Sequence, residues 1–336
     1  MIAATALPLL PRDEWWIRIF DFPRIQILLL AMFTFASYLA LKGRSGNPVF
    51  VIALALSIWH QCCMMYPYTI FWRKQVQPSR SARDDSSISL LHANVLMSNR
   101  SAQRLREIIR SVDPDLILTV ETDQWWQDQL KEFERTHPFT ISQAQDNTYG
   151  MLLYSRLPLI DARIKFLVER DIPSFHMRVR LPRGREVGLH CLHPRPPFPT
   201  EDETATDRDA ELLIVDKEIK GKDLPVIVLG DLNEVAWSRT NYLFQDVSGL
   251  LDPRIGRGFF NTFHAKYPFL RFPLDHFFHS NHFRLIELRR LPFFGSDHFP
   301  VLIALSYEPD AEREQEELHA DGSEKEEAGE KIEKAI

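Results

Sequence analysis

Several short apolar runs in the middle of this chain end or begin at a polar residue that could bind a metal ion or move a proton. Strand-like runs with such an end indicate a scaffold that presents polar groups at one cleft, because strand ends are where a rigid fold displays reactive side chains. The runs and residues are Asn94 after SISLLHA, Glu121 after DLILTV, His193 after EVGLHCL, Asp231 after LPVIVLG, Asp275 before HFFHS, and Asp297 with His298 before FPVLIALSY.

The residue types in this set favour one kind of chemistry. Carboxylates and an asparagine amide are hard oxygen ligands suited to Mg²⁺ or Mn²⁺. Histidines add groups that titrate near neutral pH. Together they suit the metal-assisted attack of water on a phosphate ester. Each residue alone could be an ordinary turn or surface residue, so the prediction depends on the whole ordered set.

The elements that must position these residues alternate along residues 87–307. Helical spacing of apolar residues covers SAQRLREIIRSV, DQWWQDQLKEF and RDAELLIVDKEIK, and strand patterns outnumber these helices. Because helices separate only some of the strands, we predict an α/β domain with mixed sheets. Two histidines compete in EVGLHCLHP: we assign His193 to the site because it ends the strand, and His190 to the sheet face or core.

The start of the chain contains two uncharged stretches of membrane-spanning length. Residues 25–41 carry no charge, and seventeen helical residues extend about 25 Å, the short end of a bilayer span. A second uncharged run covers residues 45–72, with aromatic residues near its end. We predict a transmembrane helical hairpin over residues 25–72. A pair of buried core helices and a signal peptide are the alternatives. The mean hydropathy of −0.22 excludes a polytopic transporter.

Residues 1–24 open with ten largely apolar residues, which are too few to span a bilayer. They could be part of a further membrane helix. Lysine and arginine are more frequent outside the hairpin than in its turn, which favours cytoplasmic ends on both sides. A further helix at the front would separate the two ends, so the side that the rest of the chain faces stays open.

Charge divides the remainder of the chain. Residues 73–86 are polar without an apolar period, which predicts a linker. Residues 308–336 hold twelve acidic and four basic side chains, so the net charge of −6 comes from this segment and the rest carries +2. We predict an acidic disordered tail over residues 308–336. The three cysteines offer no disulfide framework and no zinc spacing.

The ordered segments resemble the endonuclease/exonuclease/phosphatase superfamily of metal-dependent phosphoesterases, to which pancreatic-type deoxyribonuclease belongs. The most specific motifs are GDLN, with Asp231 and Asn233, and SDHFPV, with Asp297 and His298. The resemblance covers residues 87–307. The segment WWIRIFDFPR with the apolar helices after it is similar to a bacterial membrane-attached branch of the superfamily.

This resemblance implies a four-layer α/β sandwich, in which two mixed β-sheets pack face to face with helices outside and a cleft at one edge. It also implies a Mg²⁺ or Mn²⁺ cofactor. Glu121 would be the principal ligand of the metal, with help from Asn94 and Asp297.

The resemblance also implies roles for the remaining candidates. Asp231 and Asn233 would position the attacking water and the scissile phosphate. His298 would be the general base or a phosphate contact, oriented by Asp275. His193 would contact the phosphate or assist the leaving oxygen. A paired histidine and carboxylate fixes the tautomer of the ring and raises its basicity.

We therefore expect residues 87–307 to be the catalytic domain of a membrane-tethered, metal-dependent phosphoesterase, located in a membrane, the inner membrane if the chain is bacterial. The substrate would be a phosphodiester, in nucleic acid or in a lipid headgroup or small molecule. A nucleic-acid enzyme typically has a basic domain, which the balance of +2 does not supply. The sequence indicates a lipid bilayer as partner through residues 25–72 and no specific protein partner. The alternative is a membrane-anchored binding module that keeps the fold without catalysis.

Overall fold

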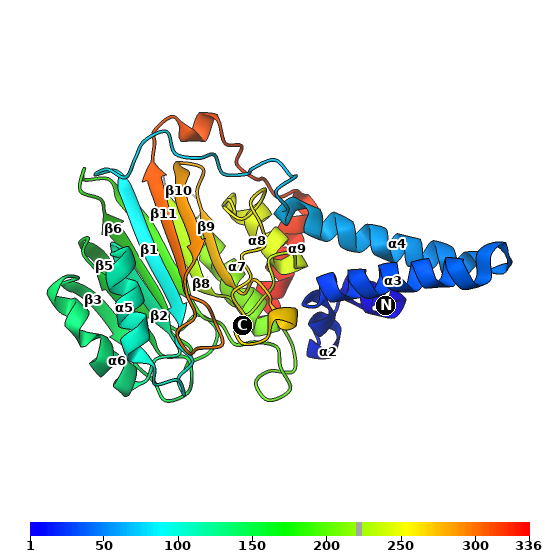
Figure 1. Cartoon of the computed structure of the whole chain (residues 1–336). Coiled ribbons are helices and arrows are strands. Elements are labelled where there is room, and N and C mark those ends of the chain that lie inside the picture. The colour runs from blue at the N-terminus through cyan, green and yellow to red at the C-terminus, as the bar shows by residue number, and fades with distance from the viewer. Residues whose placement is uncertain (220–223) are drawn as a thin grey trace.

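The computed structural model describes residues 1–219 and 224–336 and contains two β-sheets packed face to face (Figure 1). The six-stranded sheet has the order β10 (Phe283–Arg290), β11 (Val301–Tyr307), β1 (Ser87–Asn94), β2 (Leu116–Val120), β4 (Met151–Ser155) and β3 (Phe139–Gln143). The five-stranded sheet has the order β5 (Leu159–Lys165), β6 (Ser174–Arg180), β7 (Glu186–Leu192), β8 (Val226–Asp231) and β9 (Asp275–His279).

Both sheets are mixed, as the strand pattern predicts. β1 pairs in parallel with β2, and β7 pairs in parallel with β8, whereas the other neighbours are antiparallel. β1 shows how the sequence produces the layers. Its side chains alternate between the two faces of the sheet, so Ile88 and Leu90 join the core between the sheets while Leu91 and Ala93 join the core under the helices.

Helices cover both outer faces and complete the predicted four-layer sandwich. α5 (Ala102–Val112) and α6 (Gln124–Leu130) cover the six-stranded sheet. α7 (Thr206–Ile219) and α8 (Arg239–Ser248) cover the five-stranded sheet. α5 is amphipathic, with Leu105 and Ile109 buried, because apolar residues three or four apart lie on one side of a helix.

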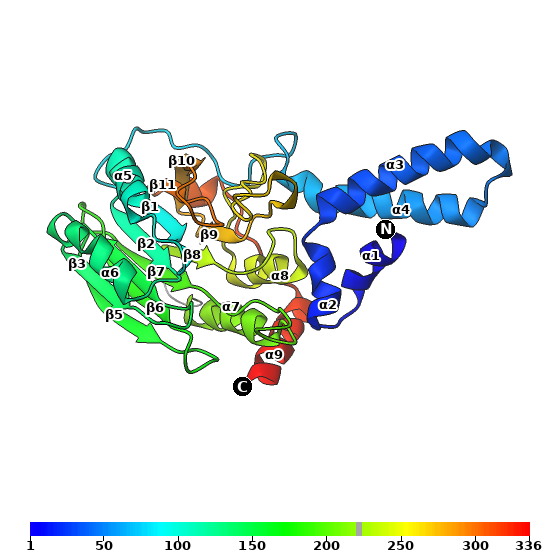
Figure 2. The same ribbon diagram turned by 60° about the horizontal axis from the view of Figure 1, so that its bottom comes forward.

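Two long helices project from this body as an antiparallel pair, α3 (Arg24–Lys42) and α4 (Pro48–Met65) (Figures 1 and 2). Only 11% of the apolar window of the first and 22% of that of the second are buried. Phe33 is 71% exposed and Trp59 is 69% exposed. Core helices of soluble proteins are mostly buried, so these helices do not match that alternative.

The short helices of the chain lie mainly at the base of this pair and in connecting loops. Before α3 come α1 (Ile2–Ala6) and α2 (Trp15–Arg18), and α1 lies beside α4. The 3₁₀ turns are η1 (Leu7–Leu9), η2 (Ile19–Asp21), η3 (Gly43–Ser45), η4 (Tyr66–Tyr68), η5 (Lys131–Arg135), η6 (Pro268–Leu270) and η7 (Ala311–Arg313).

The predicted polar linker, residues 73–86, lies against the body. Pro78 bridges to Leu285 in β10, and the backbone N–H of Leu285 donates to the carbonyl of Gln77 at 2.9 Å. Val76 is fully buried in the core between the sheets. A single apolar residue and the unpaired backbone groups of an edge strand are therefore enough to dock a segment that has no apolar period of its own.

The prediction of a disordered tail over residues 308–336 is wrong. α9 (Gly322–Ala335) begins with a capping box formed by Asp321 and Glu324. Ala328 and Ile332 pack into the apolar cluster under α7 and α8. The composition misleads because the acidic side chains have basic partners elsewhere in the chain. The ion pairs join Arg239 to Glu324 and Glu327, and Arg284 to Glu308 and Glu314.

Candidate active site

Carboxylates from both sheets meet at one edge of the sandwich, joined by the amide of Asn94. Asn94 is the last residue of β1, and Glu121 follows β2 directly. Asp231 is the last residue of β8 in the other sheet. The Nδ2 of Asn94 lies 2.7 Å from Oε1 of Glu121 and 2.9 Å from Oδ2 of Asp231. A half-buried and a buried carboxylate from separate sheets are therefore held by one amide group.

His298 is held between two of the carboxylates. Its Nδ1 lies 2.9 Å from Oδ2 of Asp275, the first residue of β9. Its Nε2 lies 3.4 Å from Oδ2 of Asp231. The ring of Phe263 packs against the imidazole at a centroid distance of 5.0 Å. The histidine is thus aligned by charge on both nitrogens and covered by an aromatic ring.

The loop before β11 brings Asp297 and His298 to the site. The hydroxyl of Ser296 donates to the backbone carbonyl of Asn94 at 2.8 Å and accepts from the N–H of His298 at 3.0 Å. The carbonyl of Asp297 accepts from the N–H of Ala265 at 2.6 Å. The side chain of Asp297 is half-buried, and its charge acts on both Glu121 and His298.

Asn233 and His193 lie next to Asp231. The backbone N–H of Asn233 donates to Oδ1 of Asp231 at 3.0 Å, and its Nδ2 donates to the carbonyl of Pro194 at 2.9 Å. The Nε2 of His193 lies 4.0 Å from Oδ2 of Asp231, and its ring faces Tyr149 at a centroid distance of 5.4 Å. The structure thus gathers all eight residues that the sequence nominates.

Two of the gathered residues have left-handed backbone conformations. Glu121 has φ = +58° and Asn233 has φ = +51°. Side chains other than glycine adopt this region at an energetic cost, and such strain is concentrated at functional sites. The unusual backbone therefore coincides with the cluster of carboxylates.

The sequence profile of the endonuclease/exonuclease/phosphatase family matches residues 91–298, which contain every residue of this cluster. The chain belongs to the endonuclease/exonuclease/phosphatase family. Among curated proteins, none matches the sequence significantly.

Solved structures of this family share the fold at low sequence identity. TDP2 of D. rerio, in a complex with a single-stranded DNA product, is 17% identical with a TM-score of 0.51, covering 66% of this chain and 99% of that one. Mannosyl-6-phosphatase Bt3783 of Bacteroides thetaiotaomicron is 17% identical with a TM-score of 0.50, covering 66% and 100%. An endonuclease/exonuclease/phosphatase of Bacteroides vulgatus is 16% identical with a TM-score of 0.53, covering 66% and 99%.

The charges of this family site are strongly coupled. Burial opposes the cationic form of His298, but the carboxylates of Asp275 and Asp231 outweigh it and raise its pKa to about 10. Burial likewise opposes the anionic form of Asp275, but His298 and His92 outweigh it and hold its pKa well below the usual range. At neutral pH this pair is therefore an imidazolium and a carboxylate.

Burial dominates at the other three groups. It raises the pKa of Glu121 to about 7, in spite of the hydrogen bond from Asn94. It also raises the pKa of Asp231. The pKa of His193 falls to about 3, because burial and then its electrostatic interactions with His92 and His298 disfavour its cationic form. His193 is consequently neutral at physiological pH.

The residues present fit a hard divalent cation. Glu121, Asp231, Asp275 and Asp297 place four carboxylates around His298, so negative charge exceeds positive charge in a largely buried site. Burial has to raise the pKa of Glu121 because no side-chain cation compensates its charge fully. Carboxylate oxygens are the ligands that Mg²⁺, Mn²⁺ and Ca²⁺ take. Family members are phosphoester hydrolases, and such a cation would supply compensating charge at this site.

The sequence prediction missed His92. Its Nε2 lies 2.8 Å from Oδ1 of Asp275, so this carboxylate contacts two histidines, one through each oxygen. His92 is two residues before Asn94 in β1, on the same face of the strand. A polar residue at an otherwise apolar inward position was the available signal. Ser296, whose hydroxyl ties the loop to β1, was also missed.

Proposed function

We propose that this protein is a membrane-tethered, divalent-metal-dependent phosphoesterase whose catalytic domain is residues 87–307. One observation carries the proposal: Glu121, Asn94, Asp231 and His298 form a continuous chain of polar contacts between the two sheets. A fold without catalysis has no need to bury carboxylates beside one another, since burial without compensation costs free energy.

Glu121 and Asp297 are the proposed metal ligands, with Asn94 beside them. In this geometry Asn94 donates through Nδ2 to two carboxylates, and its Oδ1 accepts from the N–H of Leu96 at 2.9 Å. Asn94 therefore orients the acidic ligands in this arrangement. A bound Mg²⁺ or Mn²⁺ supplies positive charge that offsets the negative charge of the phosphate in the transition state.

Asp231 is the proposed general base, and His298 is the proposed phosphate contact. Asp231 has a raised pKa and accepts from the backbone N–H of Asn233, so as a carboxylate it can hold and deprotonate the attacking water. His298 is protonated, and its Nε2–H can donate to a phosphate oxygen. Of the two roles that the sequence leaves open for His298, its high pKa favours the phosphate contact.

His193 is proposed to contact the phosphate from the side opposite His298. The neutral ring can donate a single hydrogen bond to a phosphate or leaving-group oxygen without adding charge. Asn233, bound to the carbonyl of Pro194, connects this side to Asp231. Both residues are therefore proposed to position the substrate.

The proposed membrane tether is the pair α3 and α4. Large apolar side chains cover both helices, and the pair projects from the body, against which Ile25, Leu28 and Met65 pack at its base (Figure 2). Polar residues form its turn, and Asn47 caps α4 by accepting from the N–H of Val49. α3 has 19 residues, and α4 together with η4 (Pro48–Tyr68) has 21. Both have the length and composition of bilayer spans.

A loop connects the base of this tether to the candidate active site. It begins at Phe263, which packs on His298, and reaches η6, where the carbonyl of Phe269 accepts from the side chain of Gln26 in α3. Phe269 is 87% exposed, and Tyr267 and Leu270 are exposed beside it. In both views η6 lies beside the base of α3 (Figures 1 and 2). Exposed aromatic residues at that level favour contact with a membrane surface.

A phosphodiester in a lipid headgroup is therefore the favoured substrate class. Lys266 and Arg271 lie in the same loop, where they can attract an anionic headgroup. Nucleic acid is the second candidate, because the neighbour TDP2 was solved with a single-stranded DNA product. The third is a membrane-anchored binding module without catalysis.

Full-length protein in phospholipid vesicles tests these candidates. Hydrolysis of sphingomyelin, phosphoinositides, plasmid DNA and abasic DNA would be measured with Mg²⁺ or Mn²⁺ and after EDTA. Turnover of a lipid that stops with EDTA and with E121A supports the proposal. Turnover of DNA alone selects the nuclease. Absence of turnover on every substrate, with binding retained, selects the binding module.

A further inference from the structure

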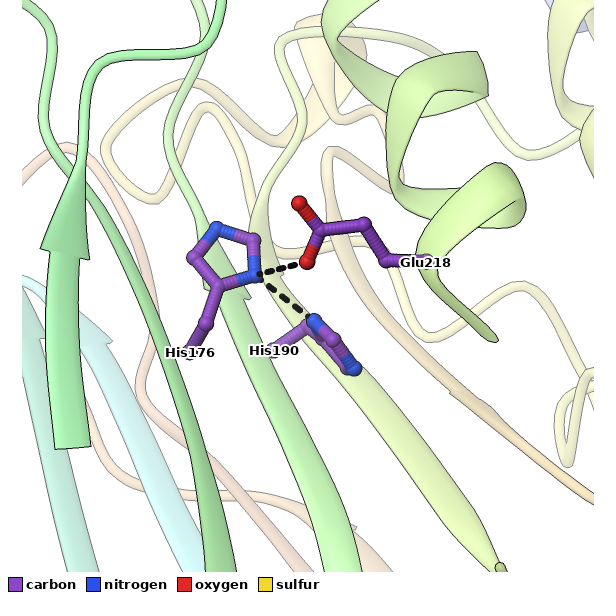
Figure 3. A group of neighbouring side chains, drawn as sticks. All are labelled: His176, His190 and Glu218. Atoms are coloured by element: carbon purple, nitrogen blue, oxygen red, sulfur yellow. Dashed lines mark hydrogen bonds and ion pairs between the residues drawn. The ribbon is translucent and has the colours of Figure 1, made fainter. Parts of the chain in front are cut away.

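A second cluster of metal-ligating side chains lies on the outer face of the five-stranded sheet. His176 in β6 and His190 in β7 are directly paired across the two strands. Their neighbours in sequence point inward to the core between the sheets, so the two histidines point outward, beneath α7. Glu218 in the last turn of α7 points at them (Figure 3).

The three side chains converge through atoms that all carry lone pairs. Nδ1 of His176 lies 2.7 Å from Nδ1 of His190 and 3.4 Å from Oε2 of Glu218 (Figure 3). One ligand atom from each residue can be chosen so that all lie within 4.8 Å of one another. Both histidines are buried, and the side chain of Glu218 is 24% exposed.

Ser174 can fix the tautomer of His176 that a metal ligand needs. The hydroxyl of Ser174 donates to the carbonyl of Lys165 at 3.3 Å. The same oxygen lies 2.9 Å from Nε2 of His176, where it can accept the proton of Nε2. In that tautomer, Nδ1 of a neutral His176 presents a lone pair to His190 and Glu218.

A positive charge among the three residues suits this arrangement. In the tautomer above, the lone pair on Nδ1 of His176 faces a carboxylate oxygen, and a metal ion can bind both. The ammonium of Lys165 binds the other oxygen, Oε1, of Glu218 and leaves Oε2 directed at the rings. Ring nitrogens with an N–H bound to a fixed acceptor are typical of metal-ligating histidines.

We propose that His176, His190 and Glu218 bind a zinc ion through Nδ1, Nδ1 and Oε2. Imidazole nitrogen with one carboxylate suits Zn²⁺, whereas Mg²⁺ takes oxygen ligands. Ligands at about 2.0–2.1 Å in a tetrahedron lie roughly 3.3 Å apart, so the two rings must separate by roughly 0.6 Å. The cluster faces a groove that Arg163, Gly188 and Leu224 also line.

A zinc ion here fastens the end of α7 to the sheet. The first turn of the same helix carries Arg208, whose Nη1 donates to the carbonyl of Asn233 at 3.1 Å. The ion therefore stabilises a helix that supports the loop of the candidate active site. The inference does not depend on which substrate, if any, the protein hydrolyses.

The test uses full-length protein in lipid nanodiscs, stripped with EDTA and then titrated with Zn²⁺ in excess Mg²⁺, which occupies the oxygen-ligand site. Calorimetry measures affinity and stoichiometry, and Co²⁺ in place of Zn²⁺ reports tetrahedral nitrogen coordination in its visible spectrum. We expect one tight Zn²⁺ per chain in the wild type and in E121Q, and none in H176Q/H190Q. S174A should weaken binding by roughly 10- to 100-fold.

The matched control is H282Q. The Nε2 of His282 lies 3.4 Å from the carboxylate of Glu312, the same separation as His176 from Glu218. The ring beside His282 is that of Tyr307, which is a phenol and not an imidazole. Its substitution should leave Zn²⁺ affinity unchanged. If H176Q/H190Q is unstable, E218Q and S174A carry the test. Equal Zn²⁺ affinity in the wild type and in these variants, or loss of the ion in E121Q, would overturn the proposal.

Discussion

His298 Nδ1 lies 2.9 Å from Oδ2 of Asp275, and both side chains are buried. This contact links the last motif of the sequence to the first residue of β9 and influences the charge of the candidate active site. Asp275 keeps the imidazole protonated, with a pKa raised to about 10. A protonated ring that faces a phosphate stabilises negative charge on the phosphate oxygens. The His298–Asp275 pair is therefore the first target for mutation.

D275N should reduce turnover by roughly 10²- to 10⁴-fold. It keeps the shape of the side chain but removes the charge that raises the pKa of His298, so the ring loses its proton at a lower pH. The alkaline limb of the pH–rate profile should therefore move to lower pH. H298Q should be similarly slow but lack that limb. An unchanged pH–rate profile in D275N would show that Asp275 does not control the protonation of His298 during turnover.

H92L should lower kcat with little effect on KM. His92 is fully buried, and its Nε2 contacts Oδ1 of Asp275 at 2.8 Å. Loss of that contact leaves one carboxylate oxygen buried without a partner, and the orientation of His298 loosens. H92Q keeps a donor at the same position and should recover part of the rate. The control is H137Q, which alters a buried histidine bound to the carbonyl of Pro114; comparable losses in both would indicate a general effect on stability.

The stabilisation by Mn²⁺ should increase with pH. The pKa of Glu121 is raised from 4.5 to about 7 in the folded protein, so its ionisation costs stability as pH rises through this window. Metal binding uses the ionised carboxylate and removes that cost. The rise in Tm on adding Mn²⁺ should thus be larger at about pH 8 than at about pH 5.5. In E121Q the rise should be small at both values, and an equal rise in the wild type at both would contradict the assignment.

K331M should destabilise the protein by roughly 3–5 kcal/mol. The ammonium of Lys331 lies 2.8 Å from Oδ2 of Asp209 and 2.9 Å from Oδ1 of Asp13. Its loss leaves Asp209 fully buried with one cation fewer. The pKa of Asp209 is depressed because Lys331 and Arg208 outweigh burial, so its contribution is present above the unfolded pKa and disappears as pH falls. Chemical denaturation measures the change, and K334M, an exposed lysine of the same helix, is the control.

F33D/L56D should release the protein from membranes. Both side chains lie on the exposed apolar surfaces of α3 and α4, and a charge there is costly in a bilayer. After carbonate extraction, the wild type should stay in the pellet and the double variant should move to the supernatant. S45D, in the polar turn between the helices, should behave as the wild type. A soluble wild type would remove the membrane tether from the proposal.

The sequence predicted mixed sheets and polar residues at strand ends because these signals are local, whereas the four-layer sandwich was implied by the family resemblance. GDLN and SDHFPV each place a polar residue at the end of a strand or shortly before one, and strand ends converge in this fold. The two long uncharged stretches predicted a pair of helices because apolar composition and length are also local properties.

The packing of the linker and the tail could not be predicted in the same way. Residues 73–86 and 308–336 have compositions typical of solvated segments, but both pack against the body. Lys331 pairs with Asp13, which is 318 residues away in the sequence, and with Asp209, which is 122 residues away. Composition counts charges without their partners, so it cannot distinguish a neutralised segment from a solvated one.

The local sequence pattern determined which residues lie at the strand ends. The period of a strand and the polarity of its last residue can both be recognised within a short segment of the sequence. Tertiary structure alone decided what those residues contact. Asp275 receives His92 from the opposite sheet, and His176, His190 and Glu218 meet only because two strands and a helix pack together. Such contacts depend on the three-dimensional packing of distant segments, which no window of the sequence contains.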